Sequence, residues 1–147
     1  MVEGLLMKNE FMLNTYPIIL KIMQKYCKDD NLIVRTSFND LVHIIGENIN
    51  DDMLGNEFRY VNFSNQIIIS RVSFLDQRKG CFTEIMNYLQ DEAKKNHIHQ
   101  IVIQSVLSVS MANWCHKHNY NISSTFLDQP IFIENSKYVH GDYVKIL

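Results

Sequence analysis

The chain has 147 residues, of which 46% are hydrophobic and 20% are charged, and its formal net charge is -2. This length and composition are typical of one globular domain, so we expect residues 1–147 to form a single domain and exclude a disordered or fibrous protein. The charge balance lacks the basic excess that suits contact with phosphate backbones, which excludes nucleic acid as a favoured partner.

The cysteines and the first residues of the chain indicate its compartment. Cys27, Cys81 and Cys115 are odd in number and follow no C-x-x-C spacing, which argues against a disulfide framework and a cysteine-based zinc site. Residues 1–10 contain Glu3 and no uninterrupted apolar run, so they predict neither a signal peptide nor a membrane span. We therefore expect a cytoplasmic protein with no membrane partner.

The first half of the chain predicts a helix followed by strands. Apolar residues recur at helical spacing from Tyr16 to Cys27, and Pro17 is compatible with the first turn of such a helix. The segment 41–45 fits a strand and a helix equally well. Short runs rich in β-branched and aromatic residues predict three strands, at residues 32–38, 58–63 and 66–74.

The clearest helical pattern begins after residue 81. Apolar residues fall on one face and polar residues on the other, which predicts an amphipathic helix that ends at Asn96 and His97. Another apolar strand follows at residues 98–107. Because the order strand, helix, strand implies a crossover, we expect residues 66–74 and 98–107 to pair in parallel. The apolar positions of the helix are Phe82, Ile85, Met86, Leu89 and Ala93.

The last third of the chain predicts a short helix at about residues 110–118, then strands at residues 125–127 or 131–133 and at residues 138–146. The fold class is therefore mixed α/β. In a crossover unit, the loop between the first strand and its helix lies at the carboxyl edge of the sheet, where ligands usually bind. In this chain that loop spans residues 76–81.

The sequence of this loop suits an anion. A helix N-terminus has N–H groups without acceptors inside the helix and the positive end of the helix dipole, so it can hold a pyrophosphate. Gly80 allows a close backbone approach or a positive φ, and Arg78 and Lys79 add charge. The segment from Gln77 to Phe82 resembles the coenzyme-A signature of the GNAT N-acyltransferases, Q/R-x-x-G-x-G/A, although Phe82 replaces the usual small residue.

A second segment is similar to this family in its spacing. The family typically shows N-x-x-A-x-x-x-Y-x-K-x-G-F on the helix after the next strand. Asn119 can take the left-handed conformation of a glycine, and Tyr120 can pack like the family's phenylalanine. In many members a tyrosine at the position of Cys115 donates a proton to the departing thiolate. The similar positions are Ser108, Met111, Trp114, Cys115, Lys117, Asn119 and Tyr120.

The resemblance implies a GNAT-like fold: a mixed, mostly antiparallel sheet with a parallel, splayed strand pair and helices on both faces. It implies an N-acetyltransferase that transfers the acetyl group of acetyl-coenzyme A to an amine of a small molecule or protein. No catalytic residue is assigned, and a homodimer is left open. The residues expected to bind acetyl-coenzyme A are Val72, Phe74, Gln77, Arg78, Lys79, Gly80, Cys81, Phe82 and Cys115.

An alternative function also stays open. The departures at Phe82, Cys115 and Asn119 fit a degenerate relative that keeps the fold and serves as a binding or regulatory module.

Two further groups of polar residues have competing interpretations. The histidine pairs of residues 97–99 and 116–118 could ligate zinc, but no carboxylate or cysteine at ligand spacing accompanies them, so we expect no metal site. An acidic stretch could line the opening for an amine, although a solvated loop is the better interpretation of a charge run. Its carboxylates belong to Glu47, Asp51, Asp52 and Glu57.

Overall fold

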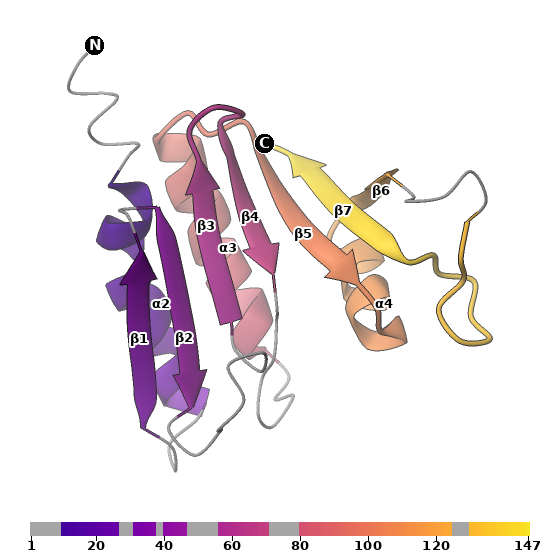
Figure 1. The fold of residues 1–147 in the computed structure, drawn as a ribbon, viewed down its shortest axis with the longest axis horizontal. Helices are drawn as coiled ribbons and strands as arrows, with labels where there is room; N and C mark the ends of the chain where they lie inside the picture. Colours follow the sequence, from indigo (N-terminus) through magenta and orange to yellow (C-terminus); the bar gives the residue numbers. More distant parts are fainter. Residues whose placement is uncertain (1–9, 27–30, 38–39, 47–55, 71–79, 125–129) are drawn as a thin grey trace.

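The structure is a computed structural model that describes residues 10–26, 31–37, 40–46, 56–70, 80–124 and 130–147 (Figure 1). These residues form a seven-stranded sheet in the order β1-β2-β3-β4-β5-β7-β6. Only β4 and β5 pair in parallel, and every other neighbouring pair is antiparallel. The mixed sheet with one parallel pair is therefore confirmed. The strands are β1 (Leu32–Ser37), β2 (Leu41–Gly46), β3 (Asn56–Val61), β4 (Gln66–Ser70), β5 (Gln100–Val106), β6 (Asn121–Ser124) and β7 (Gly141–Ile146).

Among the described residues, three helices accompany the sheet: α2 (Phe11–Tyr26), α3 (Cys81–Lys95) and α4 (Val109–Lys117). We expected Pro17 in the first turn of α2. This helix begins at Phe11, however, so Pro17 lies beyond its first turn. The apolar stripe predicted for α3 is confirmed, since all five of its residues are buried. None of the described helices is long and apolar enough to cross a lipid bilayer.

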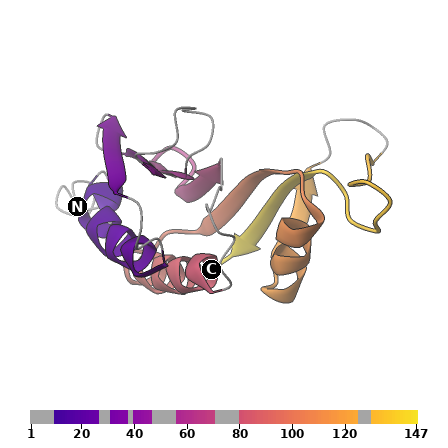
Figure 2. The same ribbon diagram turned by 90° about the horizontal axis from the view of Figure 1, so that it is seen from below.

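The helices lie together on one face of the sheet, as Figure 2 shows. Lys25 of α2 pairs with Glu84 of α3, and Trp114 of α4 donates to Thr83 of α3. The sequence predicted helices on both faces of the sheet, whereas the described helices contact one another and lie on the same face. The strands supply apolar side chains to this face at alternate positions: Val42, Ile44, Phe58, Tyr60, Ile67, Ile69, Ile101 and Ile103.

Several predicted elements change in the structure. The ambiguous segment 41–45 is a strand, held between β1 and β3. Residues 131–133 form only an isolated bridge, between Phe132 and Val139, and the edge strand β6 was not predicted. Four residues are too few for a readable alternation, and β6 gains its conformation from pairing with β7. The predicted residues 71–74 and 125–127 lie outside the described residues.

Candidate functional site

The parallel strands β4 and β5 pair at one end and part at the other. Their register runs from Gln66 opposite Gln100 to Ile69 opposite Ile103, and the side-chain amide of Gln100 donates to Gln66 at the closed end. Beyond this register β4 ends at Ser70, while β5 continues to Val106 along β7. Figure 1 shows the two ribbons diverging toward these ends.

A bulge in β5 accompanies this parting. Its register with β7 shifts between Ile103 and Val106, and Ser105 has a φ of 55°. A left-handed residue is uncommon outside glycine, so it needs local support. The support comes from β7, because the Ser105 N–H donates to Asp142 Oδ1 at 2.8 Å. Bulges bend a strand, and this one lies where β5 leaves β4.

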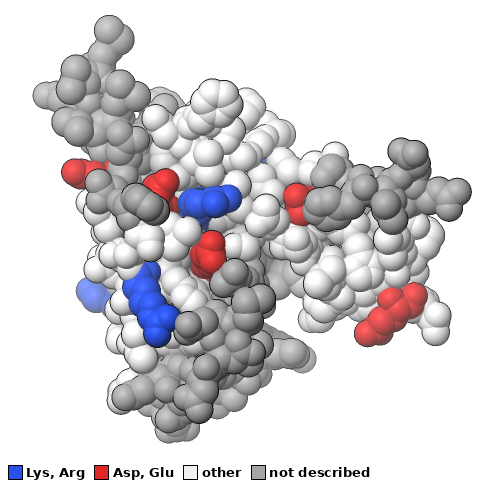
Figure 3. Space-filling model, viewed as in Figure 1, with Lys and Arg blue, Asp and Glu red and all other residues white. Residues whose placement is uncertain are grey.

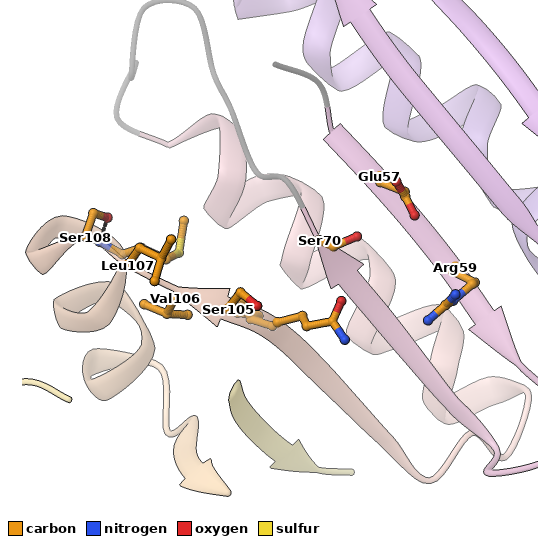
Figure 4. A pocket seen from close by; sticks show the side chains of 10 residues that line it. Glu57, Arg59, Ser70, Ser105, Val106, Leu107 and Ser108 are labelled. Carbon is orange, nitrogen blue, oxygen red and sulfur yellow. Dashed lines mark hydrogen bonds between the residues drawn. The ribbon is translucent and has the colours of Figure 1, made fainter. Parts of the chain in front are cut away.

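A cavity of about 650 Å³ occupies the opening between the strands. Figure 4 shows Glu57 and Arg59 on β3, Ser70 at the end of β4, and Ser105 to Ser108 along the end of β5 and the turn into α4. Polar and apolar side chains share the lining, as expected of a small-molecule site. The lining residues are Glu57, Arg59, Ser70, Ile103, Gln104, Ser105, Val106, Leu107, Ser108 and Met111.

Strand alternation explains how β3 supplies polar groups to this cavity. Phe58 and Tyr60 are buried on the helix-bearing face, which leaves Glu57 and Arg59 on the opposite face. Figure 3 looks onto this opposite face and shows charged side chains of both signs over its β1–β4 half. Across the strands, Glu57 pairs with Ser70 on one side and with His43 on the other.

Arg59 is a half-buried cation that pairs with no carboxylate in the part of the chain that the structure describes. Its Nε is buried with no hydrogen-bond partner, and no ion pair among the described residues includes its guanidinium. Its cross-strand neighbours are Ile68 and Leu41, so its stem lies over apolar side chains. The buried His43 also has an Nε2 atom without a partner. Within the part of the chain that the structure describes, these two buried nitrogen atoms on β2 and β3 therefore have no hydrogen-bond partner.

The start of α3 forms a second feature of the site. Gly80 is exposed and has φ 105° and ψ -26°, so it adopts the positive φ that was one of the two roles the sequence allowed for it. One turn further, Glu84 accepts two hydrogen bonds from Lys25 Nζ, at 2.8 and 2.7 Å, and one from Tyr26 Oη at 3.1 Å. These hydrogen bonds lower the pKa of Glu84, and those from Lys25 have the largest effect. Lys25 thereby offsets a negative charge near the helix start.

The short helix α4 begins beside the cavity. Ser108 is its N-cap, and Ser108 Oγ accepts from the Met111 N–H at 3.1 Å. Both residues line the cavity. Asn119, just past the end of this helix, has φ 66°, which confirms its predicted left-handed conformation.

The residues predicted to bind acetyl-coenzyme A fall into three groups. Gly80, Cys81 and Phe82 lie at the start of α3, where the side chains of Cys81 and Phe82 are buried, so that only their backbone could face a ligand. Cys115 lies in the core with a fully buried side chain, and burial raises the pKa of its thiol to about 12. The remaining predicted residues lie outside the described residues: Val72, Phe74, Gln77, Arg78 and Lys79.

The sequence left two interpretations of Glu57 and its acidic stretch open, a lining for the entry of an amine and a solvated loop, and it favoured the loop. Glu57 instead lies in β3 and lines the cavity, together with Arg59, which the sequence did not single out. The other carboxylates of that stretch, Glu47, Asp51 and Asp52, lie outside the described residues. The alternation of Glu57 and Arg59 with two aromatic residues was the signal available, since charges at period two indicate the open face of a half-buried strand.

Comparisons with known proteins support the fold. No protein-family model and no curated protein matches the sequence. A probable acetyltransferase from Staphylococcus epidermidis has a similar structure, with TM-score 0.51 and 12% identity over 93% of this chain and 94% of that protein. A probable GNAT-family acetyltransferase from Chromobacterium violaceum gives TM-score 0.48 and 13% identity, over 85% and 75% of the two chains.

A Bacillus subtilis acetyltransferase, solved with coenzyme A, gives TM-score 0.46 and 14% identity over 86% of this chain and 83% of that one. At identities this low the likeness concerns the fold. The chain thus has a GNAT-like fold, and the resemblance found in the sequence is confirmed at that level.

Proposed function

We propose that the protein is an N-acyltransferase that transfers an acetyl group from acetyl-coenzyme A to an amine. The observation that carries this proposal is the cavity that opens where the parallel strands β4 and β5 part, in a GNAT-like fold. Parting strands leave backbone N–H and C=O groups without strand partners, which a ligand with its own amides can satisfy. Coenzyme A carries such amides in its pantetheine arm.

The start of α3 fits the phosphate end of the cofactor. Gly80 is exposed and left-handed there, so no Cβ intervenes between the backbone and a pyrophosphate. The first-turn N–H groups and the helix dipole favour an anion. Lys25 neutralises Glu84, the acidic residue of this turn. We include Gly80, Cys81 and Phe82 in the site through their backbone, together with the preceding residues of the motif.

Glu57 is our candidate for the general base. When bound, acetyl-coenzyme A supplies an acyl thioester. The acceptor must lose a proton first, because an ammonium group has no lone pair, and a carboxylate in the cavity can accept that proton directly or through a water. The neutral amine then forms the C–N bond with the thioester carbonyl carbon, the C–S bond breaks, and the nitrogen loses its second proton while the departing thiolate takes one up. Such a base contributes roughly 10² to 10⁴ in rate.

A cavity-filling variant tests this function. Ser70→Phe places an aromatic ring in the opening, whereas Ser64→Phe makes the same change in the exposed turn before β4. We expect acetyl-coenzyme A at 100 times its Kd to stabilise wild type and Ser64→Phe by about 2.7 kcal/mol in thermal unfolding. Thiol release with a panel of amines should occur in both proteins and be lost in Ser70→Phe.

The outcomes separate the two functions considered. If wild type is not stabilised by acetyl-coenzyme A, the proposal fails. If coenzyme A binds but no amine is acetylated, the protein is a binding or regulatory module that keeps the fold.

A further inference from the structure

The environment of Arg59 indicates that the cavity receives a ligand group with which this side chain pairs. Its Nε is buried without a partner, and the guanidinium has no carboxylate partner among the described residues. A guanidinium stays charged at any physiological pH, so it cannot lower the free-energy cost of its burial by losing a proton. A charged donor that is left unsatisfied costs free energy, and natural structures usually supply a partner. A partner that the described protein does not provide can come from a ligand.

The spacing of Arg59 and Glu57 indicates which chemical groups that ligand carries. The two residues are separated by one position on the same strand and share its face, so their Cα atoms lie about 7 Å apart at about 3.4 Å per residue. Both line one cavity. A ligand between them therefore meets a carboxylate and, a few bonds away, a guanidinium. An amine that also carries an oxyanion complements both groups at this separation.

The rest of the cavity limits the size of the ligand. A volume of about 650 Å³ lies within the range of sites for small molecules. Val106, Leu107 and Met111 provide an apolar wall on the side opposite β3, which suits an aliphatic or aromatic group. We propose that the acceptor is a small amine bearing an oxyanion, of the amino-acid class, with Arg59 binding the carboxylate while Glu57 faces the amine. This inference rests on the proposed function.

Paired acceptors that differ only in the oxyanion test the inference. Phenylalanine and 2-phenylethylamine differ by the carboxylate, and phosphoethanolamine and ethanolamine differ by a phosphate, so the two pairs distinguish the two sources of an oxyanion. With wild-type protein, we expect a lower KM for phenylalanine than for 2-phenylethylamine. A preference confined to the phosphate pair, or none in either pair, would overturn the assignment to amino acids.

The variant Arg59→Met keeps most of the side-chain stem and removes the charge. We expect it to raise the KM for phenylalanine about 10- to 150-fold, the range for losing hydrogen bonds to a charged group, and so to remove the preference for phenylalanine over 2-phenylethylamine. Arg59→Lys should recover part of the loss, because a lysine keeps the charge without the planar fork. Lys21→Met removes an exposed charge on α2, remote from the cavity, and should change none of these values.

Calorimetry separates failure of this inference from failure of the proposed function. Coenzyme A should bind wild type and Arg59→Met equally, and weaker binding by the variant would show that Arg59 serves coenzyme A instead of the acceptor. If no amine is acetylated, phenylalanine is titrated directly into the protein, with and without coenzyme A. Binding that Arg59→Met abolishes supports the oxyanion site even when transfer is absent, and lack of such binding overturns it.

Discussion

At the scale of single residues, Gly80 and Cys115 have opposite environments. Gly80 is exposed at the start of α3 with a backbone conformation that L residues rarely adopt. Cys115 is fully buried on α4, and burial raises the pKa of its thiol. Both residues were predicted to bind acetyl-coenzyme A from their resemblance to a family motif, but such a motif does not show whether a side chain is buried. Gly80 therefore exposes its backbone at the start of the helix, whereas Cys115 fills the core.

The conformation of Gly80 determines which substitutions are informative. Gly80→Val places a β-branched residue at φ 105°, and its Cβ meets Tyr26 Oη at 3.3 Å. Gly80→Asn adds the same Cβ but tolerates the left-handed region better, whose cost for other residues is about 1 to 2 kcal/mol. We expect denaturant unfolding to show a larger loss for the valine variant, and calorimetry to show weaker coenzyme-A binding. An unchanged affinity in folded Gly80→Val would refute the anion site.

The burial of Cys115 predicts that it donates no proton during catalysis. A thiol with a pKa of about 12 stays neutral near pH 7 and has no exposed surface from which to reach a substrate. Cys115→Ala should retain kcat for acetylation within about tenfold, less than the 10² to 10⁴ of a general acid. The measurement is thiol release by wild type and variant with the same amine. A hundredfold fall at an unchanged melting temperature would assign chemistry to Cys115.

At the scale of elements, the sequence predicts best where one period persists over many residues. Helix α3 keeps its apolar stripe for about three turns, from Phe82 to Ala93, so its buried face was predicted residue by residue. The polar wall of the cavity could not be predicted in this way. It depends on the register that sets Glu57 opposite Ser70, and on where β4 stops while β5 continues. Register between strands is a tertiary property that the pattern of one strand does not encode.

The stripe of α3 also gives a quantitative expectation for stability. Leu89 is fully buried, and Leu89→Ala should lower the free energy of unfolding by about 2 to 5 kcal/mol through lost burial and a residual cavity. Asn87 is exposed on the opposite side of the same helix, so Asn87→Ala should change it by less than about 0.5 kcal/mol. Urea unfolding of both variants measures this contrast. A loss below 1 kcal/mol for Leu89→Ala would mean that the helix is not anchored by this face.

At the scale of the whole molecule, α3 links the two parts of the sheet, strands β1 to β4 on one side and strands β5 to β7 on the other. Toward α2, Glu84 pairs with Lys25. Toward α4 and the strands beyond it, Thr83 accepts from Trp114 Nε1 at 2.9 Å, and Gln90 donates to Tyr120 Oη at 3.1 Å. The sheet, whose strands β4 and β5 part at one end, is thereby bridged on its helix-bearing face by helices that contact one another.

This bridging leads us to propose that the chain folds as one cooperative domain. Trp114, the only tryptophan, lies between the rings of Phe82 and His118, with centroid distances of 4.6 and 4.2 Å. Its fluorescence therefore reports on the α3–α4 contact, whereas far-ultraviolet circular dichroism reports on all helices and strands. Because a two-state transition is independent of the probe, both signals should give the same midpoint in guanidinium chloride. A fluorescence midpoint clearly below the dichroism midpoint would mean that the part with α4, β6 and β7 opens first, and that α3 does not couple the two sides of the cavity.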